Sequence, residues 1–469
     1  MSESLAGSGG QVVVVGGGIS GLVAAYRIRR LAPRVRVTVL EAGPRVGGTA
    51  TTDVVGDCTV ERGPNGLLIG GNAIGALVDE LGLSSEVVMA DARARVRYVV
   101  RGGGFVEAPS SPPGLLRSPL LTLGGRLRLL AEPLVPRGGD REETVWSFVA
   151  RRFGPEVADN LVAPALVGVT GGDARRTELA SLFPLLAELE SRWGSVLGGL
   201  VARRLRTGES PPRPRLGTFR EGGLARLMQR LASEPGVEVL CDATVEAVRR
   251  DGVWTLTLAD GRTVAADGVV LACPAWASSE LLADVDQRLA DDLAAIPYAG
   301  LAVVTLGYER PRLRRDTDGF GFIVRRGEGV RMLGCQWTHA IFPEQVSDGT
   351  VIFRALYGGT FDPEFFELDR ASMLRTARLE LSRLLGVEEV PWLQHVTSWP
   401  VAIPQYVVGH TERVQRIDAA AARLPALALA GNALHGVGFN DCIVNADRAA
   451  RQVVAGLRAG VTSSELGPA

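Results

Sequence analysis

The sequence predicts an α/β fold in which strands, helices and glycine-rich turns alternate at both ends of the chain. Three observations support this: a strand, glycine turn, helix and strand within the first 41 residues, a strand and glycine loop over 427–443, and strand-like alternation over 295–395. The composition agrees, because 46% hydrophobic and 22% charged residues permit a large core and exclude general disorder.

The first unit begins with an apolar strand over Val12–Val15, continues as a helix that Pro33 ends, and closes with a strand over Val35–Leu40. A G-x-G-x-x-G turn joins the first strand to the helix, and Glu41 follows the second strand. In such a unit the glycines admit a pyrophosphate, the helix N-terminus supplies amides, and the acid binds ribose hydroxyls. We therefore expect a Rossmann-like domain for NAD or FAD; a tight turn without a ligand is the alternative. The residues assigned to the dinucleotide are Gly16, Gly18, Ile19, Ser20, Gly21 and Glu41.

A second glycine turn follows, in which E-x-x-x-R-x-G-G begins at Glu41 and is followed by E-R-G-P-N from Glu61. Here the sequence resembles the flavin-containing amine oxidase superfamily, which favours FAD over NAD. The resemblance implies FAD contacts for Ala42, Arg45, Gly47, Gly48, Gly63, Pro64 and Asn65. Thr49 departs from the pattern, because many members carry a second basic residue there.

The segment 111–216 is rich in leucine, arginine, proline and glycine and predicts a helical insertion. Leu115–Leu130 carries eight leucines, three arginines and no acid. Such a stretch suits either peripheral membrane contact through 111–205 or a helical wall with arginine stems lying along it. Thr207–Gly217 is expected to be a linker.

The dinucleotide domain is expected to resume after this insertion. Strand patterns occur over 236–240, 245–248, 254–258 and 268–272, and Asp260-Gly261 marks a hairpin. The predicted FAD-binding domain comprises 11–90, 217–294 and 396–460, and 91–110 with 295–395 form a discontinuous α+β substrate-binding domain. By the superfamily resemblance, the backbone at Val245 meets the adenine, and Gly431, Asn432, Val437, Gly438 and Asn440 of the C-terminal glycine loop bind the cofactor.

Composition limits the remaining classes of function. A net charge of −1 gives no case for a nucleic-acid partner, and all 51 cationic residues are arginine, which excludes Schiff-base chemistry. The five cysteines and four histidines show no ligand spacing, so neither a metal site nor a disulfide framework is expected. Cys273 is interpreted as a small buried residue rather than a redox thiol. The segment MSESLAGSGG lacks signal-peptide features, and no apolar run could span a bilayer, so a cytoplasmic protein is expected, with the inner membrane face as an alternative location.

An ordered set of further motifs sharpens the resemblance. They are Arg97-Tyr98-Val99, Gly319-Phe320-Gly321, Met332-Leu333-Gly334, Trp399-Pro400, Ile403-Pro404-Gln405-Tyr406, Gly431-Asn432 and Gly436-Val437-Gly438-x-Asn440-Asp441-Cys442. Together they resemble the oxygen-dependent protoporphyrinogen and coproporphyrinogen oxidases of haem synthesis, from about Val12 to Val454. The resemblance implies that FAD takes hydride from a porphyrinogen and that oxygen reoxidises it to give hydrogen peroxide. Six electrons leave in three rounds, with no firmly established side-chain base.

The same resemblance assigns the substrate site. Arg97 matches an arginine that pairs with a propionate, and Gly321, Ile323 and Leu356 match residues that sandwich the tetrapyrrole. Gln336 stands where relatives usually place an aliphatic residue, and Asn65 matches a residue at the reacting face of the flavin. Arg97, Asn65 and Gly321 are thus the catalytic candidates; a surface arginine and an ordinary turn asparagine are the plainer alternatives. Asp441 suits either the start of a helix or the cofactor.

Protoporphyrinogen IX is the slightly preferred substrate, with coproporphyrinogen III as the alternative. A flavin amine oxidase or a carotenoid desaturase shares the expected fold, although the absence of lysine and an aromatic content of 6% weaken the amine reading. A non-enzymatic binder resembling Rab GDP-dissociation inhibitors is the alternative from another class, against which the intact glycine turns argue. The sequence leaves a homodimer open.

Overall fold

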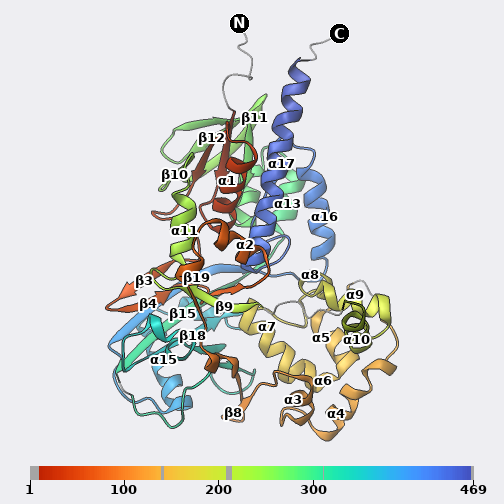
Figure 1. Ribbon diagram of the computed structural model, residues 1–469, viewed down its shortest axis with the longest axis vertical. Coiled ribbons are helices and arrows are strands. Elements are labelled where there is room, and N and C mark those ends of the chain that lie inside the picture. Colours follow the sequence, from red (N-terminus) through yellow and green to blue (C-terminus); the bar gives the residue numbers. More distant parts are fainter. Residues whose placement is uncertain (1–9, 139–141, 208–213, 310, 466–469) are drawn as a thin grey trace.

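A computed structural model describes residues 10–138, 142–207, 214–309 and 311–465 of the 469-residue chain. The polar N-terminal segment up to residue 9 and residues 208–213 of the expected linker lie outside this described part. The chain folds into a dinucleotide-type half, a second half built on a large sheet, and a helical region beside that sheet (Figure 1).

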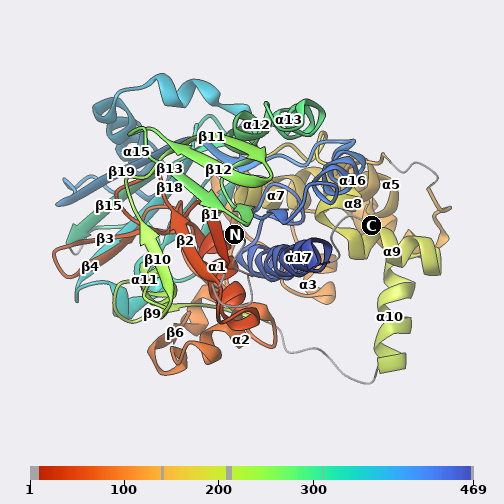
Figure 2. The same ribbon diagram turned by 90° about the horizontal axis from the view of Figure 1, so that it is seen from above.

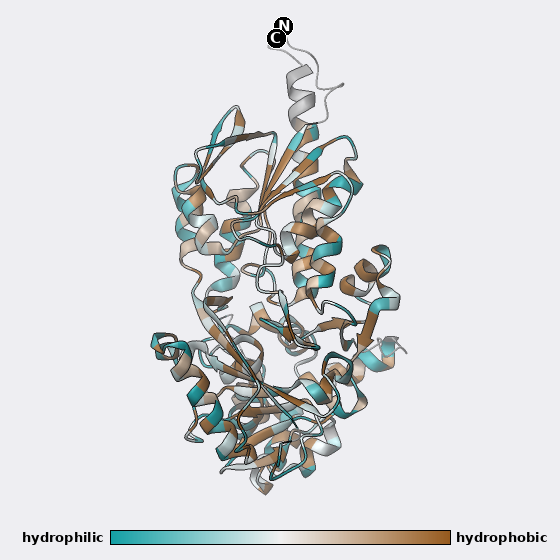
Figure 3. Cartoon of the chain, turned by 90° about the vertical axis from the view of Figure 1, so that its left-hand side faces the viewer, coloured by the Kyte–Doolittle hydropathy of each residue, from teal (hydrophilic) through white to brown (hydrophobic). Residues whose placement is uncertain are grey.

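The dinucleotide-type half is centred on a five-stranded parallel sheet of order β10-β2-β1-β14-β20. Its strands are β1 (Gln11–Val15), β2 (Arg36–Leu40), β10 (Val237–Leu240), β14 (Gly268–Leu271) and β20 (Leu427–Leu429). The apolar side chains of β1 are buried on both faces, as expected for a central parallel strand. Hydropathy colouring shows the strands of this half as largely hydrophobic (Figure 3).

Helices α1 (Ile19–Leu31) and α17 (Phe439–Glu465) pack together on one face of this sheet, joined by α11 (Ala225–Ala232) and α2 (Ala73–Glu80) (Figure 2). The other face is covered by an antiparallel sheet of β11 (Val245–Asp251), β12 (Val253–Leu258) and β13 (Thr263–Ala266). Helices α12 (Ala275–Leu282), α13 (Gln287–Ala294) and α16 (His410–Ala421) complete that layer.

The second half is a seven-stranded sheet of order β19-β15-β18-β17-β16-β7-β8. Its strands are β7 (Tyr98–Arg101), β8 (Gly104–Glu107), β15 (Tyr298–Glu309), β16 (Gly321–Val324), β17 (Gly334–Trp337), β18 (Thr350–Gly358) and β19 (Leu393–Pro404). One face packs on α15 (Arg370–Leu385) through Phe322, Trp337, Tyr357 and Leu381, all buried. A short helix, α14 (Thr338–Ile341), follows β17.

The helical region contains α3 (Pro112–Arg117), α4 (Leu123–Leu130), α5 (Val145–Phe153), α6 (Pro155–Val157), α7 (Ala163–Thr170), α8 (Leu179–Leu182), α9 (Pro184–Trp193) and α10 (Val196–Thr207). The leucine-rich stretch 115–130 is thus two helices rather than one. The break falls at Ser118-Pro119, because the residue before a proline is disfavoured in helical conformation, and Thr122 then caps α4 by accepting from the Gly125 amide.

A buried ionic cluster holds this helical region together. Arg152 of α5 is fully buried and donates to Glu132 and Glu190, while Glu132 also accepts from the amides of Val196 and Leu197 at the start of α10. Desolvation opposes ionisation of Glu190, but hydrogen bonds from Arg151, Arg152 and the Gly138 amide prevail and lower its pKa to about 2. The cluster fastens α5, α9 and α10 to the loop after α4.

Two smaller features join the parts. The hairpin of β3 (Thr52–Val55) and β4 (Cys58–Glu61) follows the second glycine turn, and a small sheet contains β5 (Leu67–Ile69), β9 (Arg215–Phe219) and β6 (Val87–Met89). The predicted domain limit at 395/396 falls inside β19, and the limit at 216/217 falls inside β9. Residues 215–217 of the expected linker are likewise a strand, because β9 pairs with β5 and β6.

Candidate functional site

Glycine is present at the three positions of the first turn for different structural reasons. Gly16 has φ of +107°, which only glycine adopts readily, and a Cβ on Gly21 would lie 1.8 Å from the carbonyl oxygen of Gly16. Gly18 has ordinary backbone angles and a Cβ there would meet nothing within 4 Å. The absence of a side chain at Gly18 therefore leaves open space at the start of α1, where backbone amides can receive a diphosphate.

Glu41 lies beside this turn and connects it to the second one. Its carboxylate accepts from the amide of Gly17 at 2.6 Å and from that of Gly43 at 2.8 Å. The Gly47 amide donates to the carbonyl of Gly17 at 2.8 Å, and a Cβ on Gly48 would lie 3.5 Å from the Cα of Gly18. The two predicted glycine turns are thus in contact, so one extended ligand could run along both.

Two distant segments complete the surroundings of these turns. The amide of Ala243 donates to the carbonyl of Glu41, which brings the chain just before Val245 to the end of β2. In the C-terminal loop, the Tyr406 hydroxyl donates to the carbonyl of Asn432 and accepts from the Gly436 amide. Tyr406 therefore fixes the shape of the loop that contains Gly431, Val437 and Gly438.

Several expected cofactor residues use their side chains elsewhere in the protein. Ser20 is buried beside the Cys442 thiol, Arg45 donates to Asp53 at 3.0 Å, and Asn440 accepts from the Ala73 amide at the start of α2. The Asp441 carboxylate accepts from the Gly438 amide at 3.1 Å, as a residue in the first turn of α17 can. A cofactor role for these residues stays a prediction.

Cys273, which was expected to be a small buried residue, is half-buried. Its sulfur lies 3.2 Å from the Ser278 hydroxyl, and desolvation raises the pKa of its thiol to about 11. Since the thiolate is the reactive form, this thiol is poorly suited to redox chemistry near neutral pH.

The expected substrate residues lie on one face of the seven-stranded sheet, which we call the inner face. Residue register places Gly321 opposite Gln336, Gln336 opposite Arg354, and Leu356 opposite Gly334. Since alternate residues of a strand share a face, these residues and Ile323 lie opposite the face that packs on α15. Arg97 lies one residue before β7 begins. The site residues are Arg97, Gly321, Ile323, Gln336 and Leu356.

The inner face contacts both other parts of the molecule. Arg354 of β18 donates to the carbonyls of Glu61 and Gly63, and the Trp399 indole donates to the carbonyl of Arg62. Ile323 lies against Gly168 of α7. The inner face is therefore enclosed by the chain between the second glycine turn and β5 and by the helical region.

Arg97 and Gly321 have distinct surroundings within this arrangement. Arg97 is exposed, and its guanidinium lies 4.7 Å from the ring centre of Phe320. A Cβ on Gly321 would lie 2.0 Å from the Cys335 carbonyl oxygen, so the close pairing of β16 and β17 itself requires glycine. Substrate contact by either residue stays a prediction.

Asn65 is the predicted residue whose side chain is most available for a ligand. It is 7% exposed, yet neither the oxygen nor the nitrogen of its amide has a protein partner among the described residues. Buried amides are normally hydrogen-bonded, so this one suits a polar group of a bound cofactor or substrate. Together with the open space at Gly18, it shows that the residues present fit a flavin dinucleotide.

Sequence reasoning missed Glu61 and Arg354, which meet at the chain that leads to Asn65. Desolvation raises the pKa of Glu61 to about 7, although the Leu224 amide and the Thr52 hydroxyl donate to its carboxylate. Desolvation also lowers the pKa of Arg354 to about 10. Glu61 and Arg354 come together only in the folded structure. The E-R-G-P-N motif indicates nothing about residues that are distant in the sequence.

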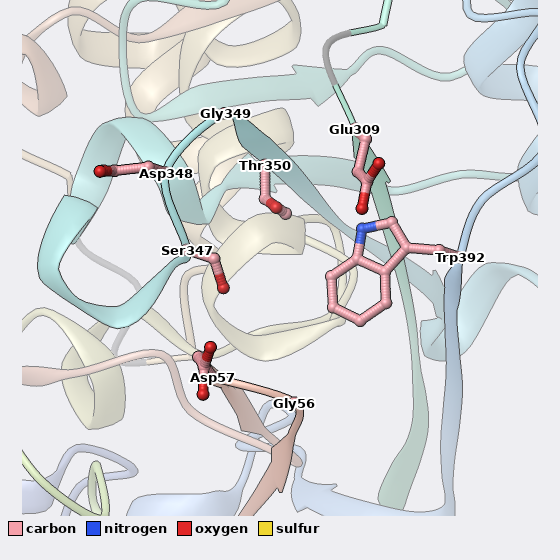
Figure 4. Close-up of a pocket in the computed structure, with 8 residues that line it drawn as sticks. All are labelled: Gly56, Asp57, Glu309, Ser347, Asp348, Gly349, Thr350 and Trp392. Carbon is pink, nitrogen blue, oxygen red and sulfur yellow. The ribbon is translucent and has the colours of Figure 1, made fainter.

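Two cavities lie outside the glycine turns, and they differ in the charge of the side chains that line them. One of about 400 Å³ lies between the β3–β4 turn and Trp392, and its lining includes the carboxylates of Asp57, Glu309 and Asp348 (Figure 4). Its charge disfavours a diphosphate or a carboxylate. Another, of about 440 Å³, lies between the helical region and the seven-stranded sheet and includes Arg176, Tyr298 and Gln405.

Comparison with known proteins identifies the family. The model of the flavin-containing amine oxidoreductase family matches residues 19–454. The chain belongs to this family. The protein is an FAD-dependent oxidoreductase.

Individual relatives of this flavin-containing amine oxidoreductase cover nearly all of the chain. It is 35% identical to protoporphyrinogen oxidase of Macaca fascicularis, over 95% of this chain and 98% of the relative. It is 27% identical to coproporphyrinogen III oxidase of Bacillus subtilis (strain 168), over 92% and 95% respectively. A provisionally assigned protoporphyrinogen oxidase structure from Exiguobacterium sp. 255-15 has a TM-score of 0.81 at 24% identity, covering 98% of this chain and 100% of the other.

Proposed function

We propose that this protein oxidises a porphyrinogen to a porphyrin in haem biosynthesis, with FAD as cofactor and molecular oxygen as electron acceptor. The observation that carries the proposal is the inner face, where Ile323 of β16 and Leu356 of β18 flank β17, and where Arg354 binds the chain that leads to Asn65. The activities named for the relatives over nearly the whole chain support it.

The chain's own residues perform binding and orientation. The amides at the start of α1 and in the second glycine turn would hold the diphosphate, and Glu41 would bind ribose hydroxyls. Arg97 would pair with a substrate propionate, while Ile323 and Leu356 pack against the apolar macrocycle. When bound, FAD supplies the hydride acceptor. The residues then act by fixing the substrate against the cofactor and excluding water.

The overall reaction balances without a further reactant. Six electrons and six protons leave the porphyrinogen, and three molecules of oxygen become three molecules of hydrogen peroxide. The first test is aerobic turnover of protoporphyrinogen IX and coproporphyrinogen III by the FAD-loaded protein, followed by porphyrin fluorescence and peroxide formation. Formation of three molecules of hydrogen peroxide for each molecule of porphyrin supports the proposal. No turnover of either substrate by yellow protein would overturn it and favour an amine or carotenoid substrate.

We also propose peripheral contact with a membrane through the helical region. Leu123, Leu127 and Leu130 of α4 and Leu134 of η3 (Glu132–Leu134) are exposed, Leu134 by 85%. The neighbouring α10 exposes Leu205 and contains only basic charges. An apolar surface with arginines and few acids suits an anionic lipid surface. Within the described residues, no helix is long and apolar enough to cross a bilayer.

Vesicle flotation tests this contact. The protein should float with vesicles containing phosphatidylglycerol but less with pure phosphatidylcholine, and Leu127→Ser with Leu134→Ser should weaken the binding. Equal flotation of the wild-type and variant proteins would contradict the proposal. Concentration-dependent sedimentation that the same variant abolishes would instead assign this surface to a homodimer.

A further inference from the structure

Arg354 occupies an unusual position for a charged side chain. It is 1% exposed on the inner face, and its Nη2 donates to the carbonyl oxygen of Gly63 at 2.6 Å and to that of Glu61 at 3.0 Å. Its Nη1 donates to Oε1 of Gln336. The guanidinium therefore connects the chain leading to Asn65 with one residue of the predicted substrate surface.

This contact fixes which way the Gln336 amide faces. A guanidinium can only donate hydrogen bonds, so the amide oxygen must point toward Arg354 and the NH₂ group must point away from it. The hydrogen bonds of the described residues give that NH₂ group no protein partner. The side chain is half-buried, so the donors meet whatever lies against the inner face.

The surroundings of Gln336 are otherwise apolar. It lies opposite Gly321, which has no side chain, and the flanking residues of the same face are Ile323 and Leu356. An apolar substituent placed there would bury two N–H groups without a partner, whereas a carboxylate would accept from them. A single polar group in an apolar wall can therefore decide between substrates that differ at one edge.

We propose that Gln336 is a specificity-determining residue and Arg354 its positioning residue, and that together they select a porphyrinogen with a carboxylate at this edge of the ring. Coproporphyrinogen III carries four propionates, whereas protoporphyrinogen IX carries two and has apolar groups in place of the others. The pair therefore favours coproporphyrinogen III. This inference rests on the proposed function and reverses the slight preference drawn from the sequence.

The test compares kcat/KM for the two porphyrinogens in the FAD-loaded enzyme. Because hydrogen bonds to charged groups are the stronger ones, the wild-type enzyme should favour coproporphyrinogen III by about tenfold or more. Gln336→Leu should remove most of that preference, chiefly through KM. The matched control is Gln394→Leu on β19, an exposed glutamine whose amide bonds the Pro391 carbonyl and which should leave the preference unchanged.

A double-mutant cycle shows whether Arg354 acts by positioning Gln336 or only by supporting the fold. Arg354→Met should reduce the preference in the wild-type background and have no further effect on it in the Gln336→Leu background, since Arg354 acts through that amide. If Arg354→Met does not fold, Gln336→Leu alone decides. Turnover of both substrates with the same preference in the wild-type and Gln336→Leu enzymes would overturn the inference and leave the proposed function standing. Absence of any porphyrinogen turnover would overturn both.

Discussion

At the scale of single residues, glycine is needed for different reasons at different positions of the G-x-G-x-x-G turn. Gly21 is glycine because α1 packs closely on the turn, whereas the protein itself makes no contact that excludes a methyl group at Gly18. Substitutions at these two positions should therefore affect different properties: folding at Gly21 and cofactor binding at Gly18.

Gly18→Ala should leave the thermal stability of the apoprotein nearly unchanged but reduce FAD occupancy strongly, because the methyl group would occupy space next to the amides of α1. Gly21→Ala should destabilise the apoprotein by about 3 kcal/mol, since a closely packed site must shift to admit the methyl group. The flavin absorbance per protein and urea unfolding of the apoprotein measure the two effects. Equal FAD loading by Gly18→Ala and wild-type protein would contradict the assignment of this turn.

Arg97 offers a second test at the same scale. Arg97→Ala should raise KM for a porphyrinogen by about tenfold, because a charge-assisted hydrogen bond to a carboxylate is lost, and should leave the flavin spectrum unchanged. Arg95→Ala is the matched control, since Arg95 is exposed two residues earlier on the chain. Initial rates over a range of substrate concentrations decide, and an unchanged KM would remove Arg97 from the site.

At the scale of elements, local patterns predicted most strands but not the contacts between elements. The strands over Val12–Val15 and Gly321–Val324 and the helix that ends at Leu31 follow the apolar pattern directly. The predicted division at 395/396 falls inside β19, because that strand continues through Pro404 by pairing with β15, which no local signal indicates. Arg354 was missed for the same reason: its partners lie almost 300 residues earlier in the chain, at Glu61 and Gly63.

The ionic cluster of the helical region gives a prediction at this scale. Glu132→Ala should destabilise the protein by about 3–5 kcal/mol, because it leaves the buried Arg152 with fewer partners and frees the first amides of α10. Glu188→Ala, at an exposed position on α9, is the control and should change stability little. Urea unfolding measured by circular dichroism distinguishes them; similar midpoints would show that the cluster contributes little.

At the scale of the whole molecule, Glu61 lies where the two halves meet. Its carboxylate binds Thr52 and Leu224 in the dinucleotide-type half, and its carbonyl accepts from Arg354 in the other. Protonation of this one group should therefore affect the stability of the assembled fold.

The pKa of Glu61 is raised from 4.5 to about 7, so the native chain holds this proton more tightly than the unfolded chain. Its contribution to the free energy of unfolding is complete below about pH 4.5 and is lost as the pH rises through about 7. Between pH 5 and pH 8, the free energy of unfolding of the wild-type protein should fall by about 2 kcal/mol through Glu61, and the Glu61→Gln variant should lack this part of the decrease. Urea unfolding at both pH values provides the measurement, and parallel pH dependences of the wild-type and variant proteins would exclude this role for Glu61.

The strand order of the parallel sheet also has a consequence for biosynthesis. Its central strand is made at residues 11–15, but the edge strand β20 is made at residues 427–429. At about 5–20 residues per second, the ribosome needs roughly 20 to 80 seconds to supply the last strand after the first. From the synthesis of β14 until that of β20, β14 has an unpaired edge, and α17 is absent from the face that it shares with α1 throughout the interval. The nascent chain therefore exposes part of its largest core until β20 and α17 have been made, and a chaperone that shields apolar surface would act on it throughout that period.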